Sequence, residues 1–90
     1  MIEVMLHLRS FLRYKLGKSE ITMSLEDGNT VEDAVRKFSN ENGPEIANYI
    51  FDKKTGKPTA LFVVNKCQVP INYALKENDE LTILPPIAGG

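Results

Sequence analysis

Reactive side chains are scarce in this chain of 90 residues. It has a single cysteine, Cys67, a single histidine, His7, and no tryptophan. One cysteine cannot form an internal disulfide, which is typical of a protein of the reducing cytoplasm. One histidine and one cysteine are also too few for a zinc site built from such ligands within one chain. We therefore expect a cytoplasmic protein without a disulfide or a metal site of its own.

Three further absences exclude other classes of protein. The longest fully apolar run is residues 60–64, far shorter than the ~20 residues that span a membrane. A glycine-rich phosphate loop is missing, so ATP is not expected to bind by that route. Eleven Lys and Arg oppose twelve Asp and Glu, which gives a net charge of -1 and disfavours nucleic acid as the main partner. We expect no bound cofactor, no membrane and no nucleic acid.

No combination of side chains predicts catalysis by the chain alone. His7 is interpreted as an exposed side chain on a strand face. Cys67 is interpreted as a packed or partly exposed structural thiol, because it has no identifiable basic partner. Lys53, Lys54 and Lys57 are interpreted as solvated loop charges. An enzyme complete in itself is therefore not expected.

Periodic patterns predict several strands and one main helix. Apolar residues alternate with polar ones over residues 2–8 and 20–26, as in strands with one buried face. Strands are also expected at residues 59–65, 68–73 and 80–84, the second of them at a sheet edge because Pro70 lacks an N–H. Thr30 is the expected N-cap of a helix that reaches Phe38 and ends before Gly43.

This order of elements predicts an α+β domain in which one main helix packs on one face of a mixed sheet. Residues 10–19 are expected to return to the core through Phe11, Leu12 and Leu16, and residues 45–51 to add a helical turn or two. The predicted core places Phe38 and Val35 of the helix beside strand residues, namely Val4, Leu6, Val63 and Ile83.

Two apolar residues fall on the other parity of their strands. Met5 and Leu84 are expected to form an exposed apolar patch that suits a partner interface. Ordinary surface hydrophobic residues account for them equally well.

The last six residues have an unusual sequence. Pro85 and Pro86 each fix φ near −65° and lack an N–H, so the chain should leave the sheet stiffly and extended. Ile87 and Ala88 are slim, and Gly89 and Gly90 have no side chain, so such a tail can enter a narrow cleft of another protein. We expect a domain of residues 1–84 and an extended tail of residues 85–90.

Residues 79–90 resemble the ending of the molybdopterin synthase small subunit family, which shares the ubiquitin-like β-grasp fold with the thiamine sulfur carriers. The resemblance extends over essentially the whole chain, although only the Pro-Pro to Gly-Gly tail is specific. Residues 45–58 are longer than in compact members of the family. The resemblance implies a β-grasp fold and a sulfur carrier whose working group is the carboxylate of Gly90.

The resemblance also implies partners and a mechanism. An E1-like adenylating enzyme would use MgATP to convert Gly90 to an acyl-adenylate, and a sulfur donor would replace AMP to leave a thiocarboxylate. The large subunit of molybdopterin synthase would pass that sulfur to a pterin precursor. Gly89, Ala88, Ile87, Pro86 and Pro85 would position the carrier group. The partner-binding residues expected from strand parity, and not from the resemblance, are Leu84 and Met5.

Three alternatives remain open from the sequence. The chain could carry sulfur for thiamine or cysteine synthesis, or it could be a ubiquitin-like modifier that is joined through Gly90 to lysines of other proteins. A plain ubiquitin-like adaptor would not need its last two residues at all.

Overall fold

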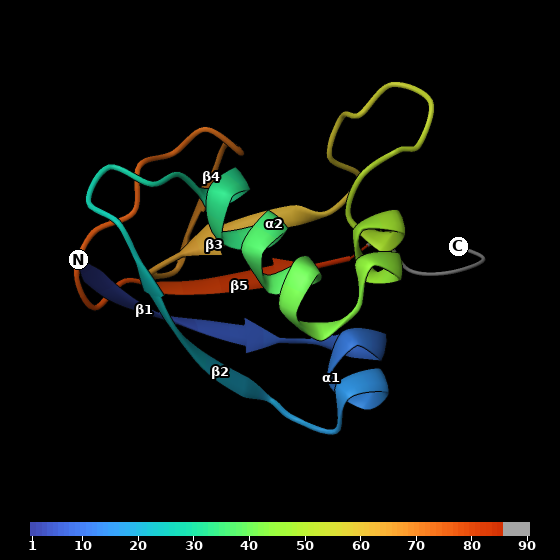
Figure 1. The fold of residues 1–90 in the computed structure, drawn as a ribbon, viewed down its shortest axis with the longest axis horizontal. Coiled ribbons are helices and arrows are strands. Elements are labelled where there is room, and N and C mark those ends of the chain that lie inside the picture. The colour runs from blue at the N-terminus through green and yellow to red at the C-terminus, as the bar shows by residue number, and fades with distance from the viewer. Residues whose placement is uncertain (86–90) are drawn as a thin grey trace.

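Five strands form one mixed sheet in the computed structural model, which describes residues 1–85 except for the side chains of Ser10 and Phe11. The strands are β1 (Ile2–Leu8), β2 (Glu20–Leu25), β3 (Leu61–Val64), β4 (Cys67–Val69) and β5 (Glu80–Leu84). They lie in the order β2-β1-β5-β3-β4. The central pair β1 and β5 is parallel, and the other neighbours are antiparallel (Figure 1).

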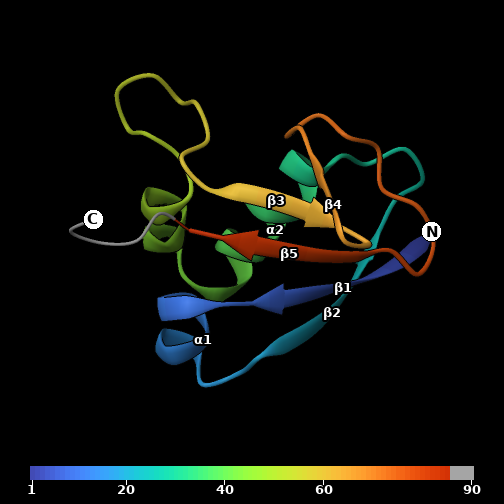
Figure 2. The same ribbon diagram turned by 180° about the vertical axis from the view of Figure 1, so that it is seen from behind.

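Helix α2 (Val31–Asn42) covers one face of this sheet. Figure 1 shows α2 in front of the strands, and Figure 2, seen from behind, shows the strands in front of α2. Phe38 and Val35 of the helix are fully buried, as are Leu6 and Ile83 of the sheet. The predicted α+β fold, with one main helix packed on a mixed sheet, is confirmed.

One predicted core residue lies on the other face of the sheet. Phe62 and Val64 are 3% exposed and face α2, whereas Val63 is only partly buried and pairs with Thr82 on the open face. The prediction that Val63 packs beside Phe38 is wrong. Residues 60–64 are all apolar, so no polar residue in this run reveals which parity faces the core.

Two short helical segments complete the end of the molecule at which β5 finishes. Residues 10–19, expected only to fold back, contain the helix α1 (Ser10–Leu16), which ends at Gly17 with φ of 68°. Leu12 is fully buried and Leu16 packs against the core, as expected. The helical turns expected near residues 45–51 are the 3₁₀ helix η1 (Pro44–Tyr49), which buries Ile46.

The edge strand β4 is shorter than predicted. It ends at Val69 because Pro70 cannot continue the ladder. Asn65 and Lys66, with φ of 50° and 74°, form the tight turn that joins β3 to β4.

Candidate functional site

The end of β5 is the base from which residues 86–90 continue. β5 is a central strand, and its Leu81 and Ile83 are fully buried. Pro85 has the same parity and is also buried, so the packed part of the chain extends one residue beyond the predicted domain. The predicted carrier and positioning residues that follow lie outside the described residues, namely Pro86, Ile87, Ala88, Gly89 and Gly90.

Side-chain hydrogen bonds fix the beginning of β5. The Asn65 amide Nδ2 donates to Oδ1 of Asp79 at 2.9 Å, and its Oδ1 accepts from the N–H of Glu80 at 3.0 Å. The other carboxylate oxygen of Asp79 accepts from the N–H of Lys76 at 2.8 Å. Asp79 is only 6% exposed, and these bonds satisfy its buried carboxylate. The strand that leads into the tail is therefore held at its start and along both sides.

The predicted pair Met5 and Leu84 does not form one continuous patch. Both residues lie on the open face and are partly buried, but Met5 pairs with Glu80, four residues before Leu84 on β5. Four residues of strand span about 13 Å. Leu84 instead pairs with Leu61, which is 51% exposed. Strand parity was correct for both residues, but the register separates them and gives Leu84 a different apolar neighbour.

His7 is more enclosed than expected. Its side chain is 16% exposed, with Nε2 at 2.8 Å from Oε1 of Glu80 and Nδ1 at 3.7 Å from Oε2 of Glu20. The interpretation of His7 as an exposed residue is therefore wrong, because carboxylates on both neighbouring strands cover the ring. These contacts join β2, β1 and β5 across the open face.

The remaining reactive residues are not brought together. Cys67 is exposed on the edge strand β4, which is more open than the packed or partly exposed thiol that was expected. Among residues 1–85, no three His, Cys, Asp or Glu side chains form a group that could hold a metal ion. No helix in the same part of the chain is long and apolar enough to cross a bilayer.

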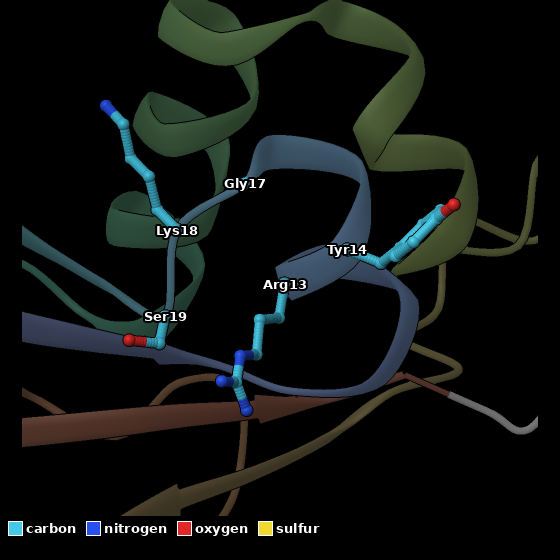
Figure 3. A pocket seen from close by; sticks show the side chains of 5 residues that line it. All are labelled: Arg13, Tyr14, Gly17, Lys18 and Ser19. Atoms are coloured by element: carbon cyan, nitrogen blue, oxygen red, sulfur yellow. The ribbon is translucent and has the colours of Figure 1, made fainter.

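A surface hollow at the end of α1 was not predicted from the sequence. It is lined by Arg13, Tyr14, Gly17, Lys18 and Ser19. Figure 3 shows that the long side chains of Arg13, Tyr14 and Lys18 spread in different directions instead of converging on one point. Tyr14 is 90% exposed. The hollow therefore has the character of an exposed basic surface and not of an enclosed ligand site. The feature of the sequence that could have indicated this basic surface is the absence of any acidic residue between Glu3 and Glu20.

Comparison with known proteins identifies the family. Residues 8–90 match the model of the ThiS family, so the match includes nearly every element and reaches the final glycine. The chain belongs to the ThiS family. No curated protein matches its sequence.

Several solved structures share the fold of this chain. The small archaeal modifier protein 1 of Methanosarcina acetivorans is 27% identical, with a TM-score of 0.81 over 100% of this chain and 98% of that one. The small archaeal modifier protein 1 of Haloferax volcanii is 21% identical, with a TM-score of 0.84 over 98% and 99%. A putative molybdopterin converting factor subunit 1 of Pyrococcus furiosus is 19% identical, with a TM-score of 0.79 over 97% and 100%. The fold is the ubiquitin-like β-grasp, and the chain is a member of the ubiquitin-like sulfur carriers and modifiers.

Proposed function

We propose that this chain carries sulfur on the carboxylate of Gly90 and serves as the small subunit of molybdopterin synthase. The observation that carries the proposal is the family match, which continues through the Gly89-Gly90 ending. The likeness to a protein described as subunit 1 of a molybdopterin converting factor supports the choice of pathway. A chain of this kind acts together with a catalytic partner and is not itself the enzyme.

The proposed chemistry begins with activation of the carboxylate by an E1-like enzyme. A carboxylate is a poor acceptor because oxide is a bad leaving group. The activating enzyme, using MgATP, joins the Gly90 carboxylate to the α-phosphate of ATP and releases pyrophosphate. A sulfur donor then attacks the acyl carbon, the C–O bond to AMP breaks, and a thiocarboxylate remains. The large synthase subunit takes up this sulfur for the pterin precursor. The chain itself holds no nucleotide and no metal in this scheme.

The residues before Gly90 position the carrier group. Pro85 and Pro86 restrict the backbone, which lowers the entropy lost when the tail enters a partner. Ile87, Ala88 and Gly89 keep the approach to the reacting carbonyl narrow. The buried Pro85 and the central position of β5 give this tail a fixed starting point.

The open face of the sheet supplies the proposed partner surface. Leu84 lies directly before the tail, and Leu61 beside it is the more exposed residue of the pair. Two apolar residues at the base of the tail suit the core of an interface. Met5 lies four residues back along the open face, so its contact with the partner is proposed separately from that of Leu84.

A protein modifier is the second candidate, because two of the similar structures are described as small archaeal modifier proteins. In that role the activated Gly90 carbonyl is joined to a lysine amine and not to sulfur. Sulfur carriage for thiamine or cysteine synthesis uses the same first steps and differs only in the acceptor.

Deletion of Gly90 tests the proposal. The deletion should leave the melting temperature unchanged but abolish useful sulfur transfer. The terminal carboxylate of the shortened chain ends about 3.3–3.6 Å short of the position at which the activating enzyme reacts with it. Misplacement by ~1 Å can already cost about a hundredfold in rate. The measurement is intact mass after incubation with the activating enzyme, MgATP and a sulfur donor. A variant with one residue added after Gly90 should also fail, because its terminal carboxylate is no longer that of Gly90.

Each candidate gives a different product. A gain of one sulfur for one oxygen at Gly90, followed by dithiolene formation with the large subunit, supports the molybdopterin proposal. Conjugates of higher mass linked through lysine support the modifier. Normal sulfur transfer by the deletion variant contradicts every role in which the Gly90 carboxylate is the carrier group.

A further inference from the structure

Positive charge gathers at the end of the molecule where β5 finishes. Within residues 4–19 all four Lys and Arg residues are exposed, and the loop of residues 52–58 adds three exposed lysines. We call these seven residues the basic collar: Arg9, Arg13, Lys15, Lys18, Lys53, Lys54 and Lys57. The collar contains most of the eleven basic residues of a chain whose net charge is -1.

Acidic residues gather at the opposite end. That end contains the start of β1, the turn of residues 26–29 after β2 and the segment of residues 76–80 that leads into β5 (Figure 1). Its carboxylates belong to Glu3, Glu26, Asp27, Glu32, Asp33, Glu77, Asp79 and Glu80. The collar end has fewer acids, namely Glu20, Glu41, Glu45 and Asp52. The molecule therefore has a charge asymmetry along its strands although its total charge is small.

The collar residues have no ion-pair partner within residues 1–85. The ion pairs of this part of the chain involve the N-terminus, His7 and Arg36. Two basic residues elsewhere do have structural contacts, since Arg36 lies over the Phe51 ring and Lys37 donates to the carbonyl of Ser24. Toward the described part of the chain, only Arg9 of the collar donates a side-chain hydrogen bond, at 3.5 Å to the carbonyl of the residue before it, Leu8. Stability of the fold therefore does not explain the charges of the collar.

The topology places the two parts of the collar on both sides of the end of β5. β5 lies between β1 and β3 in the sheet. Because β1 is parallel to β5, both strands finish at the same end of the sheet, and α1 follows β1 there. Because β3 is antiparallel to β5, β3 begins at that end, and the 52–58 loop precedes it. Figures 1 and 2 both show α1 and the 52–58 loop at this end. Both parts of the collar therefore lie at the end of the molecule at which the described chain finishes, at Pro85.

We propose that the basic collar docks on an acidic surface of the adenylating partner, around the cleft that receives the tail. This inference rests on the proposed function. Exposed charges contribute little to the strength of an interface but raise the rate of association, by about 10- to 1,000-fold in steered complexes. The asymmetric charges turn the carrier so that the tail end approaches first. The effect is screened by salt, because the Debye length is about 8 Å at 0.15 M ionic strength.

Charge reversal at two ends of the molecule tests the collar. The measurement is kcat/KM for adenylation of the full chain by its activating enzyme, at ionic strengths of about 0.05 M and about 0.5 M, where screening differs strongly. The test variants are Lys15→Glu with Lys18→Glu, and Lys53→Glu with Lys54→Glu. The matched control is Lys66→Glu with Lys76→Glu, which makes the same change of charge at the acidic end. Lys15→Arg with Lys18→Arg keeps the charge and should behave as the wild type.

Each collar variant should lose at least about tenfold in kcat/KM at low salt, with kcat at saturating carrier nearly unchanged, and the loss should disappear at high salt. The control should change less than about twofold, and all melting temperatures should stay close to that of the wild type. An equal loss in the control, or a loss that salt does not remove, overturns the proposal. Unchanged adenylation together with weaker RNA binding by the collar variants would assign the collar to RNA instead. A wild-type chain that is never adenylated contradicts the proposed function, whereas normal adenylation of all variants contradicts the collar alone.

Discussion

On the face of the sheet that α2 covers, Val4, Leu6 and Ile83 are at most 1% exposed, whereas on the open face Leu61 is 51% exposed and Met5 is only partly buried. The same strands supply both sets, since successive side chains of a strand point to opposite faces. The covered face is filled by the helix and has no room for a partner. The open face keeps apolar residues that the fold itself does not enclose. Alternate residues of single strands therefore build the core on one face and the surface proposed for the partner on the other.

The largest effect should come from the covered face. Phe38→Ala should cost about 3–5 kcal/mol of unfolding free energy, because Phe38 is fully buried between α2 and the sheet. Val63→Ala is the matched change on the open face and should cost about 1 kcal/mol or less. Urea denaturation with linear extrapolation measures both. Equal costs for the two variants would show that the faces do not differ in this way.

An intermediate effect should come from the open face and should appear in binding. Leu84→Gln should weaken affinity for the synthase or activating partner about tenfold, which is about 1.4 kcal/mol, with little change in melting temperature. Glutamine is chosen because it adds no charge next to the basic collar. Binding can be followed by calorimetry with each purified partner.

Met5→Gln is the control that sharpens this test. Met5 shares the open face but lies beside Glu80, about four residues along the strand from the pair of Leu84 and Leu61. A loss at Leu84 alone limits the interface to the base of the tail, and equal losses extend it along the face. Unfolding of the Leu84 variant would show that this residue belongs to the core.

The two faces also differ in how well the sequence predicts them. The buried face of β1 was predicted correctly because the polar Glu3 and His7 alternate with Val4, Leu6 and Leu8. Val63 was assigned to the wrong face because its neighbours are all apolar. The separation of Met5 from Leu84 depends on the register between β1 and β5, strands more than 70 residues apart in the chain, and parity alone does not contain that information.

Short helices were also difficult to predict from the sequence. α1 has only two turns, and its N-cap, Arg9, makes no side-chain capping bond, so the usual start signal is missing. The basic collar was visible only in parts, as three lysines near Gly56 and as a stretch without acids. Its two parts come together through the strand order, which brings segments about 40 residues apart in the chain to the two sides of β5. The tail differs from the collar in this respect. Its sequence is the most specific in the chain, but all of it except Pro85 lies outside the described residues.

The smallest of the expected effects concerns the start of α2, on which the covered face depends. Thr30 accepts from the N–H of Asp33 at 3.3 Å, and the Asp33 carboxylate accepts from the N–H of Thr30 at 2.8 Å. The N–H groups of Val31 and Glu32, which have no partner within the helix, each donate to a loop carbonyl at 2.9 Å. Thr30→Ala removes the hydroxyl, which accepts from the N–H of Asp33 and donates to the Asp33 carboxylate at 3.1 Å, together with the methyl group. The change should cost about 1 kcal/mol of unfolding free energy. Thr30→Ser keeps the hydroxyl and should lose much less in the same urea titration. A Ser variant as unstable as the Ala variant would mean that the methyl group, and not the capping hydrogen bond, stabilises this end of the helix.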